Sequence, residues 1–231
     1  MKIISVFLFL LLLVLGAIGT ATAELIDRGN GMIYDSDQDI TWMQDANYFY
    51  TSAYPGGVVH TFGGEQQYHD ADIWADQLVY GGYNDWRLPT VIGEISPHYE
   101  DNTEFKGYNL TNSEMGYMYY VNLGNLGEFD TYGNQRLPGA YGLLNTGPFI
   151  NLIPETYWTG TFAGILEAYP PYFTFNMATG ESSSMIERPY NVAYGWAVRD
   201  GDVTPTPISG AIWLLGSGLL GIVGIKRKFN T

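Results

Sequence analysis

The sequence predicts an α+β fold in which short antiparallel strands and one or two helices are joined by long loops. Three observations predict this class. Short apolar runs with period-two alternation recur between clusters of Gly, Asn and Pro, as strands and tight turns do. Residues 70–80 carry the spacing of an amphipathic helix. Residues 122–148 are rich in Gly, Asn and Pro, which favours a loop over a regular element.

The part of the chain between its two ends is strongly acidic, and the whole chain lacks cysteine. All 24 acidic residues lie between Glu24 and Asp202. The basic residues of this part are six, so its formal charge is 6 − 24 = −18; they are Arg28, Arg87, Lys106, Arg136, Arg188 and Arg199. A field of this sign repels phosphate backbones, so nucleic acid is not an expected partner. The absence of cysteine excludes disulfides, thiolate metal sites and cysteine nucleophiles.

Residues 1–23 are predicted to be an export signal. Lys2 supplies the positive n-region, an apolar run follows, and the segment ends in an A-x-A cleavage site at Ala23. Cleavage there starts the mature chain at Glu24, whereas an uncleaved segment would be a membrane anchor. Residues 24–202 then form one domain, long enough for a single sizeable core.

The first part of the domain, residues 25–47, is predicted to form strands joined by tight turns. A Gly-Asn-Gly turn at residues 29–31 separates two apolar runs, as in a β-hairpin. A second hairpin connects residues 32–34 to residues 40–43 through an acidic turn. Residues 45–47 follow as a further turn or helix cap.

The acidic turn offers a weak candidate calcium site. Asp35, Asp37 and Asp39 alternate like the first ligands of an EF-hand loop. However, Ile40 stands where that loop requires glycine, and Ala46 stands where it requires a bidentate glutamate. Two interpretations stay open, a solvated turn and a calcium site.

The helix predicted at residues 70–80 leads into the stretch around which the domain is organised. Its apolar stripe is expected to consist of Ile73, Trp74, Gln77 and Leu78. Two glycines stop the helix, because glycine takes positive φ at little steric cost. The chain then continues as YGGYNDWRLPT, residues 80–90.

Within this stretch, Trp86 and Leu88 alternate with charged neighbours as in a short strand, which Pro89 ends. Trp86 is interpreted as a core anchor because of its large apolar area, although it could also be a ligand platform. Arg87 is expected to hold a carboxylate inside the domain through its fork of donors.

Two short helices and a long loop are expected next. Thr90 can cap a helix over residues 91–96, and Ser113 or Asn112 can cap another that runs to residue 121. Residues 122–148 are the expected ligand-facing surface, although a loop of this length can also merely cover the fold.

The remaining strands are expected at residues 157–161, 172–177 and 194–199, with a turn at residues 178–181. Trp158 and Trp196 lie in the first and last of them, and alternation in the last places one face inward. The strands from the two ends of the domain are predicted to pair in the core of the sheet.

Together, these segments resemble the Lcl C-terminal domain family, also called DUF1566, as found on exported bacterial proteins. The resemblance covers nearly all of residues 24–202 and rests on DRGNGMIYD, DITWMQDANY, the WA-x-x-L helix at residues 74–78, GGYNDWRLPT, SEMGYMYYVNLGN, YWTGT and YGWAVRDGD. It implies a C-type-lectin-like fold and surface adhesion, with polyanionic glycans as ligands of family members. The acidic domain departs from what a polyanion receptor needs. WRLPT is also similar to a segment of formylglycine-generating enzymes, but this chain lacks cysteine for their thiol chemistry.

The C-terminal end is predicted to cross a membrane. Residues 203–207 form a Thr/Pro linker, and residues 208–225 are an uncharged apolar run, about 27 Å long as a helix. The tail, residues 226–231, is basic and expected in the cytoplasm. This order resembles a PEP-CTERM sorting signal of the VPLPA type, which implies processing by an exosortase, although TPTPISG departs from that core. The residues concerned are Pro205, Pro207, Lys226, Arg227 and Lys228.

The sequence therefore predicts an exported cell-surface or matrix module that binds a glycan or another polymer, either anchored in the membrane or released after processing of its tail. The alternative is a structural surface or biofilm protein without a specific small ligand. Catalysis is not expected: acidic pairs such as Glu100 and Glu104 arise by chance among 24 carboxylates, and no Ser-His-Asp motif or metal-site spacing is present.

Overall fold

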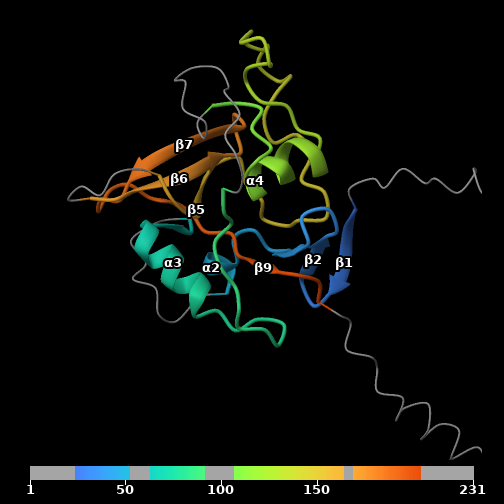
Figure 1. Cartoon of the computed structure of the whole chain (residues 1–231), viewed down its shortest axis with the longest axis vertical. Helices are drawn as coiled ribbons and strands as arrows, with labels where there is room; N and C mark the ends of the chain where they lie inside the picture. Colours follow the sequence, from blue (N-terminus) through green and yellow to red (C-terminus); the bar gives the residue numbers. More distant parts are fainter. Residues whose placement is uncertain (1–23, 53–62, 92–106, 164–168, 204–231) are drawn as a thin grey trace, which may run out of the picture.

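The computed structural model describes residues 24–52, 63–91, 107–163 and 169–203, which form two sheets flanked by short helices (Figure 1). The predicted α+β class is confirmed. Among these residues, no helix has the length and apolar character needed to cross a membrane. The predicted export signal, the linker prolines, the apolar run at 208–225, the basic tail and the helix predicted over residues 91–96 fall wholly or almost wholly outside them.

One sheet joins the two ends of the domain. Its strand order is β1-β2-β3-β9, and every neighbouring pair is antiparallel. Both predicted hairpins are confirmed, and Asn30 in the first turn has φ of 53°, a left-handed conformation that asparagine tolerates. The pairing of β9 with β3 confirms that strands from the two ends meet. The strands are β1 (Leu25–Gly29), β2 (Met32–Asp35), β3 (Ile40–Met43) and β9 (Val198–Asp200).

The second sheet has the order β4-β8-β5-β6-β7. The pairing of β5 with β8 is parallel, and the other pairings are antiparallel. Strands β5, β6 and β7 form a long three-stranded ribbon that extends to the left in Figure 1. The strands are β4 (Glu65–Gln66), β5 (Thr156–Phe162), β6 (Pro171–Asn176), β7 (Glu181–Ile186) and β8 (Ala193–Tyr194).

The prediction of one strand over residues 194–199 is wrong. The chain ends β8 at Tyr194, passes through Gly195, Trp196 and Ala197, and begins β9 at Val198 in the other sheet. Because this crossing lies between the sheets, all side chains from Ala193 to Arg199 are buried and no alternation exists. The structure also differs from the prediction at β7, because the sequence indicated the turn at residues 178–181 but not the strand that follows it.

In the described parts of the chain, three helical segments lie beside the sheets, the last of them formed by α4 and η1 together. α2 (Tyr48–Thr51) follows the predicted turn, in which Asp45 accepts a hydrogen bond from the backbone N–H of Asn47. α3 (Tyr68–Asp76) confirms the predicted amphipathic helix, but it ends at Asp76 and not at the two glycines predicted to stop it, and only Trp74 and Leu78 of the predicted stripe are buried. Ile73 is 38% exposed and Gln77 is exposed, whereas Tyr68, Ala71, Trp74 and Ala75 are buried.

The third helix confirms the prediction at residues 113–121. α4 (Glu114–Tyr117) starts at Ser113, whose hydroxyl accepts a hydrogen bond from the backbone N–H of Gly116 at 2.9 Å. It continues as one turn of π-helix, η1 (Met118–Asn122), and stops before Gly124, which has φ of 64°. This helix delivers the chain directly to residues 122–148.

The core between the sheets is dominated by tryptophan. Trp42 and Trp196 pack with ring centroids 4.3 Å apart, and the indole N–H of Trp196 donates to the carbonyl of Met43. The indole N–H of Trp158 donates to the carbonyl of Gln66 at 2.8 Å. Trp86 is also buried, as are Leu88 and Pro89, which confirms Trp86 as a core anchor.

Candidate functional site

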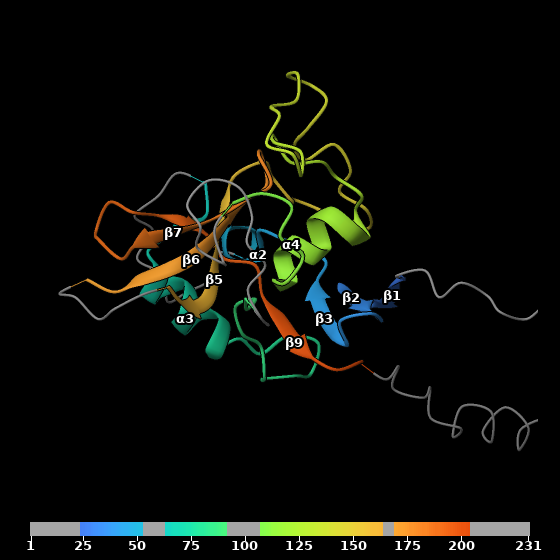
Figure 2. The ribbon, with the colours of Figure 1, turned by 45° about the horizontal axis from the view of Figure 1, so that its top comes forward.

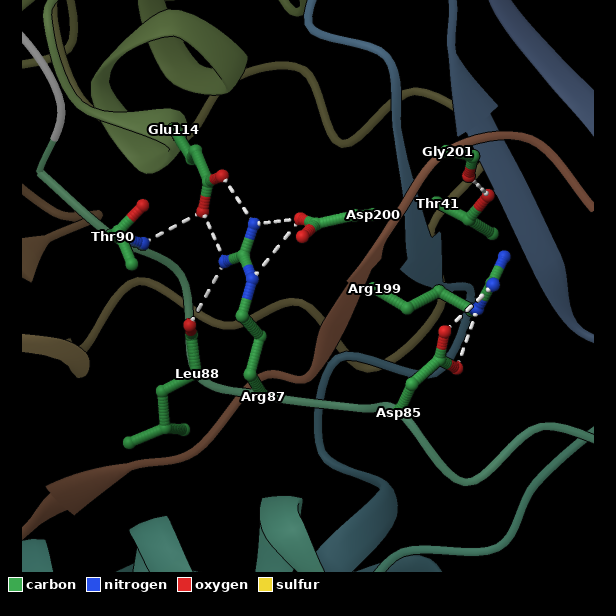
Figure 3. Close-up of polar contacts among 9 residues, drawn as sticks. All are labelled: Thr41, Asp85, Arg87, Leu88, Thr90, Glu114, Arg199, Asp200 and Gly201. Carbon is green, nitrogen blue, oxygen red and sulfur yellow. Dashed lines mark hydrogen bonds and ion pairs between the residues drawn. The ribbon is translucent and has the colours of Figure 1, made fainter.

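Arg87 is the centre of an ion-pair network in which the Glu114 carboxylate is buried and Arg87 is half-buried (Figure 3). Its Nη1 and Nη2 donate to the two carboxylate oxygens of Glu114, at 2.8 and 2.7 Å. Nε and Nη2 also donate to Asp200 on β9. The same Glu114 carboxylate accepts the backbone N–H of Thr90 at 2.6 Å. The prediction that Arg87 holds a carboxylate is confirmed, and the network joins the WRLPT segment, α4 and β9.

Two further ion pairs fasten the end of β9. Arg199 donates to both carboxylate oxygens of Asp85 at 2.8 Å, and its guanidinium lies 4.1 Å from the centre of the Tyr83 ring. The hydrogen bond from Arg199 lowers the pKa of Asp85. Arg28 on β1 pairs in the same bidentate manner with Asp202. The guanidinium groups of Arg28 and Arg199 are therefore occupied by ion pairs within the domain.

The three aspartates of the acidic turn face different partners. Asp35 is fully buried and accepts hydrogen bonds from the backbone of Asp37 and from the amide of Asn122. Asp37 accepts the hydroxyl of Tyr117 at 2.8 Å, a bond that raises the pKa of that tyrosine to about 12. Asp39 accepts the hydroxyl of Tyr34.

The three carboxylates of this weak calcium candidate are therefore each bonded to a separate protein partner, and calcium would need them to converge in one oxygen cage. Asp35, Asp37 and Asp39 each accept hydrogen bonds from other residues of the domain. In the parts of the chain that the structure describes, no group of three or more His, Cys, Asp or Glu side chains is placed to hold a metal ion.

Residues 122–148, called here the 122–148 loop, are the candidate binding surface. The loop projects from the end of η1 and points away from α3 in both views of the ribbon (Figures 1 and 2). Bridges between Leu126 and Gly142 and between Phe129 and Gln135 give it a hairpin-like form. It is therefore an ordered projection.

Hydrogen bonds from buried side chains hold the base of the loop. The amide of Asn125 donates to the carbonyl of Asn145 at 2.8 Å and accepts the backbone N–H groups of Leu144 and Asn145. Farther out, Nη1 of Arg136 donates to the carbonyls of Gly127 and Phe129, at 2.6 and 2.8 Å. The loop is thus pre-organised, which reduces the entropy lost when a ligand binds.

The tip of the loop exposes an aromatic ring and aliphatic side chains. Tyr132 is 88% exposed and Leu137 is 78% exposed; Leu126 and Leu144 are also exposed. The carboxylate of Asp130 accepts the backbone N–H groups of Tyr132 and Asn134, each at 2.8 Å. An ordered loop with exposed apolar side chains is the usual form of an interaction surface.

Fold and site together define an α+β domain in which an ion-pair network ties distant segments together and an ordered loop projects from the end of η1. Comparisons with protein-family models, curated proteins and solved structures find no match to this chain. Loop length and composition predicted the loop, whereas nothing in the sequence indicated that Asn125 and Arg136 would hold it.

Replacing Asn125 with alanine should loosen the loop without unfolding the domain. The change leaves the backbone N–H and carbonyl of Asn145 without their Asn125 partner, at a cost of about 1–3 kcal/mol, whereas the N–H of Leu144 keeps its bond to the carbonyl of Gly142. Hydrogen exchange of the Asn145 amide should accelerate by about tenfold or more. The control Asn134→Ala removes an exposed side chain and should change stability by less than about 0.5 kcal/mol. Unchanged exchange in Asn125→Ala would contradict this anchoring role.

Proposed function

We propose that this chain is an exported cell-surface or matrix protein whose 122–148 loop binds a glycan or another polymer. The observation that carries the proposal is the loop itself. It is held by the buried Asn125 and the half-buried Arg136, and it presents Tyr132 and Leu137 to solvent. Aromatic faces suit the CH surfaces of sugars, and exposed apolar side chains on one ordered loop suit an interaction surface.

The proposal includes a C-type-lectin-like fold and the resemblance to the Lcl C-terminal domain family. Supporting features are the pairing of β9 with β3, which brings the two ends of the domain together, and the long loop between β4 and β5 in the sequence. Export and membrane attachment rest on the sequence of residues 1–23 and 208–225. Processing by an exosortase belongs to the same proposal.

Binding by the loop is tested with the full-length chain in detergent micelles, passed over a panel of immobilised polysaccharides. The double variant Tyr132→Ala/Leu137→Ala should lose retention by about tenfold or more, since aromatic anchors dominate binding surfaces. The matched control is Tyr190→Ala, because Tyr190 is 93% exposed but lies in the connection between β7 and β8. Equal retention of the double variant and the wild type would contradict the proposal and favour the structural surface protein.

A further inference from the structure

We infer that the ligand of the 122–148 loop is an uncharged glycan and not a polyanion. The inference rests on the proposed function and names the class of polymer that the loop takes. Three features of the described residues carry it: the engagement of the arginines, the charge around the loop, and the chemistry of its tip.

The first feature is that the arginines of the described residues are already engaged. Arg28, Arg87 and Arg199 form ion pairs with carboxylates. Arg136 donates to two backbone carbonyls, and Arg188 lies 5.4 Å from the centre of the Tyr169 ring. Recognition of sulfate, phosphate or carboxylate groups uses the charged fork of an arginine or a lysine ammonium. A polyanion would have to compete with these internal partners.

The second feature is the negative charge around the loop. Glu128 and Asp130 lie on the loop, where Arg136 is the one basic residue. Backbone and side-chain hydrogen bonds from Asn134 lower the pKa of Asp130, so its carboxylate is ionised at neutral pH. The backbone N–H of Glu128 donates to the carbonyl of Thr179, which sets the loop beside the turn before β7 and its residue Glu181. A polyanion approaching this surface meets repulsion.

The third feature is the chemistry of the tip, which suits sugar hydroxyls and CH groups. The exposed ring of Tyr132 offers a flat apolar face. Next to it, Asn134 and Gln135 are exposed and carry amides that both donate and accept hydrogen bonds. Their amides also bond to Asp130 and Glu128, which fixes the positions of both side chains. An exposed aromatic face bordered by oriented amides and carboxylates matches a neutral polysaccharide.

The test compares four probes on the full-length chain in detergent: cellulose, chitin, heparin and poly-lysine, each at low and high salt. We expect retention on cellulose or chitin that is insensitive to salt, because no ion pairs form. Tyr132→Ala should weaken this retention by about tenfold or more, and Tyr190→Ala should leave it unchanged.

The other outcomes overturn the inference in distinguishable ways. Retention on heparin that depends on Tyr132 and falls with salt would refute the uncharged ligand while leaving the proposed function in place. Retention on poly-lysine alone, unaffected by Tyr132→Ala, would mean capture by the overall negative charge and would refute the loop as the site. Failure to bind any of the four probes, or any member of the polysaccharide panel, would overturn both the inference and the proposed function.

Discussion

Replacing Arg87 with methionine is expected to lower the free energy of unfolding by about 3–5 kcal/mol, because it leaves the buried carboxylate of Glu114 without its cation. The Glu114 side chain is 2% exposed, so water cannot replace the lost bonds. The loss of unfolding free energy should lie near the lower end of this range, because the Arg87 side chain is itself 30% exposed. Equilibrium unfolding in urea measures the change.

Two companion variants separate the buried pair from the exposed one. Asp200→Asn removes a partner whose side chain is 79% exposed and should cost less than about 1 kcal/mol. The double variant Arg87→Met/Glu114→Gln should recover part of the loss, because no unpaired charge stays buried. If Arg87→Met cost no more than Asp200→Asn, the network would not be the centre that ties the domain together.

The identity of the carboxylates that bind Arg87 could not be predicted from the sequence. Its fork of donors indicated an internal anion, but Glu114 lies 27 positions away and Asp200 lies 113 away. Only the folded backbone brings them together, through the bridge of Arg87 with Val198 and the start of α4 beside Thr90. Local chemistry predicts that a partner exists, whereas topology decides which one.

The hairpins were predictable because their signals are local. The Gly-Asn-Gly turn and the alternating apolar runs beside it specify β1, β2 and β3 without distant contacts. Strand β7 has the sequence ESSSMI, which offers no apolar alternation, and it forms by pairing along its whole length with β6. Its assignment depends on tertiary structure, which outweighs local preference.

The relation between the ion-pair centre and the loop emerges only in the structure. Glu114 begins α4, and η1 ends at Asn122, where the 122–148 loop starts. The amide of Asn122 donates to buried Asp35, so both ends of this helical segment are tied to other parts of the domain. The loop therefore projects from a fixed base, which is the arrangement that the proposed binding surface requires.

The second large effect is expected in the core, where Trp196→Ala should lower the free energy of unfolding by about 3–5 kcal/mol. Trp196 lies in the crossing between β8 and β9, and its ring contacts Trp42 and Phe149 with centroids 4.3 and 4.8 Å apart. Truncation would open a cavity between the two sheets that the rigid neighbours cannot fill. Thermal and urea unfolding of the purified variant measure the loss.

A matched pair of phenylalanine substitutions separates packing from hydrogen bonding at this position. Trp42 and Trp196 are both fully buried and pack on each other, but only the indole N–H of Trp196 has a partner within the described chain, the carbonyl of Met43. Trp196→Phe removes a donor from that carbonyl, whereas Trp42→Phe removes a buried donor that has no hydrogen-bond partner among the described residues. Trp196→Phe should therefore cost about 1–2 kcal/mol more than Trp42→Phe. Equal costs would mean that Trp196 acts through its volume alone.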